Sequence, residues 1–292
     1  PGYLAPAARR YDLFYPRLPR PLGLPLKKVH VTVDAASAPL PRASAVRRSG
    51  WRLRAGHALY RLATRLHWAE PELNGLRAVV RPGDAVLDIG AALGMYTVPL
   101  ADIVGRDGRV FAFEPQRRGV LTVRLLRVLT GARQGTTRRV ALGPNAGDGH
   151  IAVPFRRGFP IFGHGHIAEG ADDGQHRLHQ SRTHIDTVDA WCAAHGIDRV
   201  AFIKVDVEGF EPSVIEGARR IIDRDRPSLL LEIEDRHLVR YGRDAAGFLA
   251  ELHERWPEYR MHTWDGAHWI ETGTVDPATR NYLFATEAAL AG

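Results

Sequence analysis

The chain has 292 residues, is 45% hydrophobic and 25% charged, and carries a net charge of +7 at pH 7. This length and composition are typical of a globular protein with one large core. A single cysteine, Cys192, excludes an internal disulfide framework and a cysteine-built zinc site. No apolar run reaches the roughly 18 residues that span a bilayer, and no signal peptide opens the sequence, so we expect a cytoplasmic protein.

The first 50 residues predict a basic, proline-rich arm. Residues 1–54 hold eleven Lys or Arg against two Asp, a net of 11 − 2 = +9, which leaves −2 for the rest of the chain. Six prolines among the first 25 residues disfavour helix and favour an extended segment. We expect a solvated arm or one docked on its own domain or on a twin subunit in a homo-oligomer, and an anionic partner such as nucleic acid is the less favoured alternative.

Residues 51–80 predict a helical lead-in to the core domain. Apolar residues recur at helical spacing at Leu59, Leu62 and Leu66, and again at Leu73 and Leu76. We therefore expect two helices in this segment.

From residue 81 to the end, short β-rich runs alternate with helical patterns. Strands are predicted at 85–89, 109–113, 137–142, 200–205 and 228–233, with helices near 95–104, 117–130, 186–195, 211–223 and 244–256, and two last strands in "YRMHTW" and "NYLFATE". This alternation predicts an α/β, Rossmann-like domain with a doubly wound, mainly parallel sheet. Residues 143–183, rich in Gly and His, interrupt it and predict a substrate-contacting insertion or lid.

The stretch "AVLDIGAALGMYT" predicts a ligand-binding turn after the first strand. Glycines at 90 and 94 let a ligand approach the backbone at the carboxyl end of a parallel strand. The spacing D-x-G-x-x-x-G lacks the paired glycines of dinucleotide binders. Asp88 would repel a pyrophosphate but suits an ammonium group, which favours S-adenosylmethionine (SAM) over NAD.

A second acid supports the same ligand. The run "RVFAFEP" ends the second strand at Glu114, 24 residues after Gly90. A carboxylate at this place accepts hydrogen bonds from the two ribose hydroxyls of a nucleoside. An NAD-dependent Rossmann oxidoreductase stays open as an alternative.

The stretch "IKVDVEGFEPSVIEGA" at 203–218, together with "RPSLLLEIE", "DIGAALGMYT" and "FEP", resembles the FkbM family of SAM-dependent methyltransferases. The resemblance runs from about residue 86 to 233. It implies a class I methyltransferase fold with a seven-stranded sheet, and O-methylation of a hydroxyl on a sugar, glycan or secondary metabolite. The cofactor contacts predicted here are Asp88, Gly90, Ala91, Gly94, Tyr96, Glu114, Ala141, Asp206 and Glu208.

Four residues near the ends of the fourth and fifth strands are candidates for catalysis. Lys204 and Asp206 lie two apart on a strand, and a lysine in a covered strand predicts an ion pair. Asp206, Glu232 or a histidine of the insertion is a candidate base for the acceptor hydroxyl. His237, just after the fifth strand, is a further candidate catalytic residue. For Glu211 we expect capping of the next helix.

The sequence also contains two groups of potential metal ligands. Asp206, Glu208, Glu232 and His237 could hold a divalent cation, but carboxylate-rich strand ends are common without one, so we expect no metal. The histidines of the insertion lack regular zinc spacing, so we expect no zinc there.

A nucleic-acid methyltransferase is an alternative function that would use the basic arm. The stretch "DVEGFE" lacks the proline pair and the aromatic residue of amino-directed enzymes. Carbon-directed pyrimidine enzymes need a nucleophilic cysteine, and Cys192 is in the wrong place for that.

Overall fold

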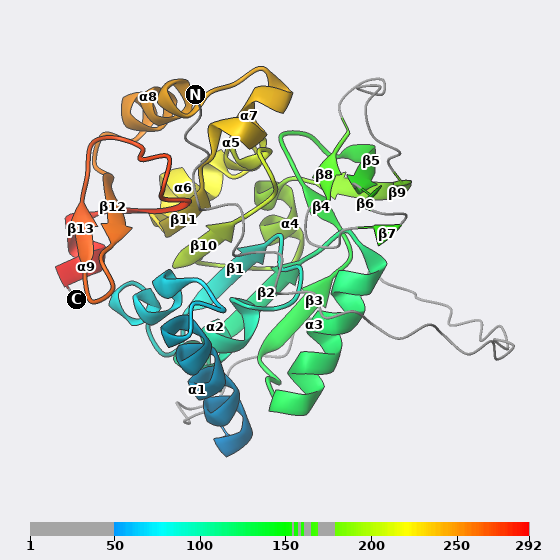
Figure 1. Ribbon diagram of the computed structural model, residues 1–292, viewed down its shortest axis with the longest axis vertical. Helices are drawn as coiled ribbons and strands as arrows, with labels where there is room; N and C mark the ends of the chain where they lie inside the picture. Colours follow the sequence, from blue (N-terminus) through cyan, green and yellow to red (C-terminus); the bar gives the residue numbers. More distant parts are fainter. Residues whose placement is uncertain (1–49, 154, 157–158, 161–164, 169–178, 292) are drawn as a thin grey trace, which may run out of the picture. The chain divides into compact units, whose positions relative to one another are not determined.

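The computed structural model describes residues 50–291, apart from 154, 157–158, 161–164 and 169–178 (Figure 1). The predicted arm, up to residue 49, lies outside these residues. The lead-in begins with helix α1 (Trp51–Arg65), as predicted. Two 3-10 turns, Pro71–Asn74 and Leu76–Ala78, replace the second predicted helix. They meet at Gly75, where ring atoms of Trp264 and Trp269 would lie 2.7 Å from an added Cβ.

The main sheet has eight strands in the order β13-β12-β14-β11-β10-β1-β2-β3. They are β1 (Ala85–Ile89), β2 (Arg109–Phe113), β3 (Gly135–Arg138), β10 (Phe202–Val205), β11 (Ser228–Glu232), β12 (Arg260–Trp264), β13 (Trp269–Glu271) and β14 (Asn281–Ala285). The five strands from β11 to β3 run parallel, whereas β14 and β13 pair antiparallel with their neighbours. The prediction of a doubly wound, mainly parallel sheet is confirmed, and the short β13 adds an eighth strand at the edge.

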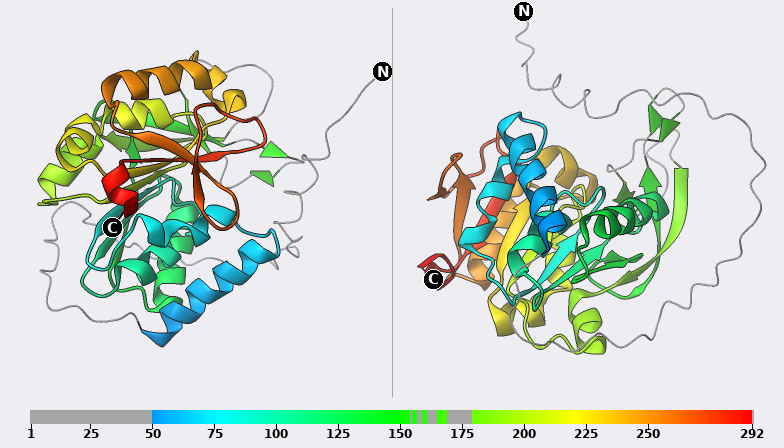
Figure 2. Two further views of the ribbon diagram at one scale, coloured as in Figure 1. Left: turned by 90° about the vertical axis from the view of Figure 1, so that its left-hand side faces the viewer. Right: turned by 90° about the horizontal axis from the view of Figure 1, so that it is seen from below.

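Helices cover both faces of this sheet (Figure 2). The first face carries α1, α2 (Thr97–Val104) and α3 (Arg117–Thr130), and the other carries α4 (Val188–Ala194), α5 (Glu211–Glu216), α6 (Arg219–Asp225) and α8 (Ala245–Arg255). The chain also forms α7 (Asp235–Leu238) and α9 (Glu287–Ala291). Because both faces are covered, the strands β10 and β11 are buried along their whole length.

The predicted helix over 211–223 is two helices, because Gly217 lies between them in tight contact with the insertion. A Cβ at Gly217 would lie 2.0 Å from the carbonyl oxygen of Gly143. Among the described residues, no helix is both long and apolar enough to cross a membrane.

The insertion forms a second, smaller sheet in the order β4-β9-β5-β8. Its strands are β4 (Ala141–Leu142), β5 (Gly147–Val153), β8 (His166–Ile167) and β9 (His179–Asp186), and a separate pair joins β6 (Phe155–Arg156) to β7 (Phe159–Pro160). The strand predicted over 137–142 is therefore wrong as one unit. The chain leaves the main sheet after Arg138, and Ala141 then pairs with Ile185 of the small sheet.

Candidate active site

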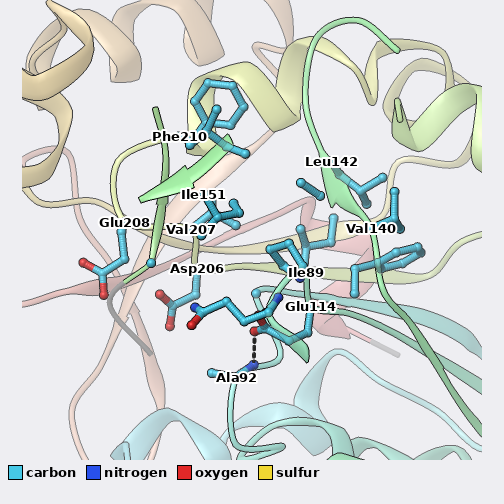
Figure 3. Close-up of a pocket in the computed structure, with 17 residues that line it drawn as sticks. Ile89, Ala92, Glu114, Val140, Leu142, Ile151, Asp206, Val207, Glu208 and Phe210 are labelled. Carbon is cyan, nitrogen blue, oxygen red and sulfur yellow. Dashed lines mark hydrogen bonds between the residues drawn. The ribbon is translucent and has the colours of Figure 1, made fainter. Parts of the chain in front are cut away.

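A pocket lies at the carboxyl ends of β1, β2 and β10, where β1 has β2 on one side and β10 on the other. In a doubly wound sheet this reversal of strand order is the place where ligands bind. The space inside the pocket and its open mouth together is about 620 Å³. Its wall combines carboxylates from strand ends with apolar side chains from the small sheet (Figure 3).

The glycine turn after β1 is shaped by a close approach to β10. Gly90 has φ +83°, and an added Cβ would lie 1.7 Å from the carbonyl oxygen of Asp206. Its N–H donates to the carbonyl of Phe113 at 3.0 Å. A side chain at position 90 would separate the two strand ends, so glycine is required here.

Glu114 projects into the pocket from the end of β2 and is held rigidly. It is 3% exposed, and its carboxylate accepts a hydrogen bond from the N–H of Ala92 at 2.9 Å (Figure 3). It accepts a second from the N–H of Gln116 at 2.7 Å. Burial raises the pKa of this carboxyl to about 7, although the two N–H groups favour its charged form. Gly119 makes room for it, since a Cβ there would lie 2.6 Å from the Glu114 side chain.

Apolar residues form the opposite wall of the pocket. Val140, Leu142, Ile151 and Phe210 face the space between them in Figure 3. Because Ile151 belongs to β5, the insertion supplies part of this wall, as the prediction of a substrate-contacting segment requires.

Lys204 and Asp206 form the predicted ion pair. The ammonium nitrogen of Lys204 lies 3.6 Å from the Asp206 carboxylate and donates to the side-chain oxygen of Asn281 at 2.8 Å. Lys204 is 1% exposed, and burial alone would lower its pKa, but the carboxylates of Asp206 and Glu70 outweigh burial and raise it. Lys204 therefore stays charged and holds Asp206, which lines the pocket.

Of the nine predicted cofactor residues, five line the pocket: Gly90, Glu114, Ala141, Asp206 and Glu208. Asp88 instead lies under the turn at 1% exposure and accepts a hydrogen bond from the Thr97 hydroxyl at 2.5 Å. Burial raises its pKa to about 6. Tyr96 is also buried, donating its hydroxyl to Glu70 at 2.5 Å. Ala91 and Gly94 lie in the turn after β1 and are not among the residues that line the pocket, so cofactor contacts by these four residues stay predictions.

The segment "DVEGFE" after β10 is a tight turn organised by its own acid. The buried carboxylate of Glu211 accepts hydrogen bonds from the N–H groups of Val207 at 2.9 Å and Gly209 at 3.2 Å, which lie in the turn before α5. Among the described residues, no side-chain hydrogen bond caps α5, so Glu211 ties down the turn and does not cap the helix as predicted. Gly209 has φ +99°, and a Cβ there would lie 2.4 Å from the carbonyl oxygen of His237. Glu208 has φ +58°, a left-handed backbone that is uncommon for a side chain of its size.

Glu232 and His237 lie beside Glu208, next to the pocket rather than in its wall. Glu232 is 2% exposed and contacts the guanidinium of Arg280. Burial raises the pKa of Glu232 well above its ordinary value, and the carboxylate of Asp206 adds to this. Burial lowers the pKa of His237, although the nearby Glu208 opposes that shift.

Two other predicted features fall outside the pocket or outside the described residues. Cys192 is buried, and burial raises the pKa of its thiol to about 12, which agrees with a structural role. Of the insertion's histidines, His164 and His176 lie outside the described residues. His166 and His184 belong to β8 and β9.

The residues present fit a SAM-like ligand. Glu114 offers a buried carboxylate to a ribose diol, Asp206 adds a second carboxylate to the pocket wall, and the apolar wall suits a flat ring. Sequence reasoning missed Phe210 in the wall and the partners Asn281 and Arg280. These two come from β14 and the residue before it, and no local pattern signals such distant contacts.

Comparison with known proteins places these residues in a family profile. The profile described as "Methyltransferase FkbM domain" matches residues 88–259, more than half of the chain. A search of the curated proteins gives no match.

Several solved structures are similar to this chain. The FkbM methyltransferase from Methylobacillus flagellatus KT is 22% identical, with a TM-score of 0.45 over 74% of this chain and 50% of that one. This chain thus spans half the length of that relative. Fibrillarin from Aeropyrum pernix, in complex with natively bound S-adenosyl-L-methionine, is 15% identical, with a TM-score of 0.40 over 70% of this chain and 67% of that one. A SAM-dependent O-methyltransferase from Thermotoga maritima is also 15% identical, with a TM-score of 0.40 over 74% of this chain and 63% of that one.

Proposed function

Since this chain belongs to the FkbM family of methyltransferases, we propose that it transfers the methyl group of SAM to a hydroxyl oxygen of a sugar, glycan or secondary metabolite. One observation supports this most: the family match covers the strand ends that carry Glu114 and Asp206, and both carboxylates face one pocket. The acceptor class comes from the resemblance of the chain to the family.

The chain's part in cofactor binding follows from the pocket wall. When bound, SAM supplies a methyl group on a positively charged sulfonium. Glu114 would accept the ribose hydroxyls, because the N–H groups of Ala92 and Gln116 already fix its carboxylate. Val140 and Leu142 would flank the adenine, and Gly90 leaves room for the ligand at the backbone.

The remaining task of the chain is to orient the acceptor hydroxyl and to take its proton. Among the described residues, Asp206 is the one of the four predicted catalytic side chains that lines the pocket. In this proposal Asp206 accepts the proton of the acceptor hydroxyl. Lys204 is a positioning residue, because its ammonium nitrogen lies 3.6 Å from the Asp206 carboxylate and holds it in place. A carboxylate is a weak base, which suffices when the proton leaves late in the transfer.

The cofactor is tested by calorimetry of the purified chain with S-adenosylhomocysteine and, separately, with NAD. We expect micromolar binding of the first and none of the second. Glu114→Gln should weaken S-adenosylhomocysteine about ten- to a hundredfold, because it removes a charge-assisted hydrogen bond. Glu254→Gln, an exposed change on α8, is the control. Binding of NAD alone would overturn the proposal and favour an oxidoreductase.

The acceptor is tested with radiolabelled SAM and panels of hydroxylated glycans, metabolites and RNA. We expect label on a hydroxyl of a glycan or metabolite, and Asp206→Asn should lower kcat more than it changes KM. Label on RNA alone would refute the proposed acceptor class and would favour a nucleic-acid methyltransferase.

A further inference from the structure

Three buried side chains beside the pocket form a set of potential metal ligands. Glu208, Glu232 and His237 each offer one ligand atom, and these atoms lie within 4.8 Å of one another. Glu208 follows β10, Glu232 ends the neighbouring β11, and His237 lies on the short helix after it. The adjacent carboxyl ends of two parallel strands therefore bring the three groups together.

The imidazole of His237 stands between the two carboxylates. Its Nε2 lies 3.1 Å from Glu208 Oε2, and its Nδ1 lies 3.7 Å from Glu232 Oε2. The second separation is too long for a hydrogen bond. Neither His237 Nδ1 nor Glu232 Oε2 has a hydrogen-bond partner among the described residues, and both atoms are buried. Buried polar atoms are nearly always paired, so this arrangement is one that a cation would complete.

The ion pair of Glu232 with Arg280 occupies only one of its two carboxylate oxygens. Arg280 contacts Oε1 of Glu232, and Oε2 is turned toward His237.

We propose that Glu208, Glu232 and His237 bind one divalent metal ion beside the pocket. Two carboxylates and one imidazole suit Mn²⁺ or Zn²⁺. Glu208 also lines the pocket, so the ion would lie next to the bound substrate. If the proposed function holds, the ion would polarise the acceptor hydroxyl and ease loss of its proton to Asp206.

The test titrates Mn²⁺ into the full, tag-free chain after treatment with a chelator. We expect one ion per chain, at least about tenfold weaker binding in Glu232→Gln and in His237→Gln, and no change in Glu254→Gln. The histidines of the insertion are intact in every variant, so metal held there gives a signal that His237→Gln does not alter. No binding by the unaltered chain, or binding that neither variant changes, overturns the proposal.

Two further measurements keep the test decisive. Glu232→Gln also removes an ion pair with Arg280, so Glu208→Gln serves as a second carboxylate variant and circular dichroism checks that each is folded. S-adenosylhomocysteine binding is measured on the same samples. A chain that binds this ligand but no metal refutes the metal site and leaves the proposed function in place.

A second observation, independent of the pocket, concerns the outer face of α1. Leu53, His57 and Thr64 are buried on its inner face. The outer face carries large apolar side chains at helical spacing: Trp51 at 72% exposure, Leu59 at 67%, Leu62 at 50% and Leu66 at 50%. Trp68, just after the helix, is 61% exposed. The apolar stripe that predicted this helix from the sequence thus faces solvent.

Helix α3 repeats this pattern next to α1. Leu121, Leu125, Val128 and Leu129 are all more than half exposed. The two helices are in contact, since a Cβ at Gly56 of α1 would lie 3.0 Å from the methyl group of Thr130. Exposed apolar groups of this number on adjacent elements indicate a binding surface.

The charge on both helices is of one sign. Residues 51–68 and 117–130 each contain four arginines and no Asp or Glu. A second copy of this face would bring like charges together, which disfavours self-association through it. Arginines beside exposed Trp and Leu are the composition of helices that lie in the interface of an anionic membrane.

We infer that the outer faces of α1 and α3 dock on an anionic lipid surface. The test is flotation with vesicles of phosphatidylcholine alone and with about one quarter phosphatidylglycerol. We expect binding to the anionic vesicles that weakens with salt, and about tenfold or greater loss in a Leu59→Gln, Leu62→Gln, Leu66→Gln variant. Val239→Gln with Ile270→Gln, exposed elsewhere, is the control.

Three outcomes would overturn this inference. The first is no vesicle binding, and the second is binding that the triple variant retains, since the basic arm remains in that variant and would then be responsible. The third is self-association of the unaltered chain that the triple variant abolishes, which would make the face a contact between copies.

Discussion

Gly90→Ala tests whether the close approach of β1 and β10 shapes the site. An added Cβ would lie 1.7 Å from the carbonyl oxygen of Asp206, while side-chain carbons in proteins stay at least 3.0 Å from such atoms. The strand ends must therefore separate by 3.0 − 1.7 = 1.3 Å. Alanine at φ +83° adds backbone strain of about 1 to 2 kcal/mol. With overpacking of about 1 to 3 kcal/mol, we expect a loss of about 2 to 5 kcal/mol in the free energy of unfolding.

Gly83→Ala is the matched control for this change. Gly83 has φ +93°, and nothing lies within 4 Å of its added Cβ, so the variant has the backbone strain without the clash. Urea unfolding of both variants, followed by circular dichroism, isolates the clash as a difference of about 1 to 3 kcal/mol. Calorimetry with S-adenosylhomocysteine should show weaker binding in Gly90→Ala alone. Equal stability of the two variants would refute this account of the turn.

Three other expectations follow from the buried groups. Because the pKa of Glu114 is raised to about 7 and the charged form accepts more hydrogen bonds, affinity for S-adenosylhomocysteine should rise with pH through about 7; a flat profile, or one that Glu114→Gln retains, contradicts this. Lys204→Met leaves the Asp206 carboxylate and the Asn281 oxygen without their cation, so urea unfolding should show a loss of about 3 kcal/mol, and a loss under 1 kcal/mol would argue against the pair. Cys192, with a thiol pKa of about 12, should react with a thiol reagent at pH 8 only after unfolding, and rapid labelling of the folded chain would contradict its burial.

Secondary structure was predicted best where the apolar pattern and the residue that ends the element indicate the same boundary. The strand at 85–89 and the helix at 117–130 match the structure because each is an apolar pattern ended by glycine. The apolar pattern of α1 predicted a helix, but it did not predict which face of that helix is buried. Leu59, Leu62 and Leu66 show the period of a helix, and periodicity alone does not tell which face a partner covers.

The sequence predicts the site residues that follow strands, but not the contacts that site residues make with residues far away in the sequence. Glu114 and Asp206 follow apolar strands, so topology alone places them at one edge of the sheet. Asp88 also follows this rule, but its side chain turns toward Thr97 in the helix layer. The partners of Lys204 and Glu232 come from Asn281 and Arg280, and contacts across so many residues leave no periodic signal.

The position of β14 sets the order in which the site can form during synthesis. This strand lies between β11 and β12, and it brings Asn281 to Lys204 and Arg280 to Glu232. The turn at Gly90 and the carboxylate of Glu114 need only residues made much earlier. A nascent chain can therefore build the Glu114 side of the pocket first, whereas the hydrogen bond from Lys204 to Asn281 and the ion pair of Arg280 with Glu232 must wait until residue 281 has left the ribosome. Pairing across such a sequence distance is slow, so completion of the Lys204 and Glu232 side is expected to be the late step of folding.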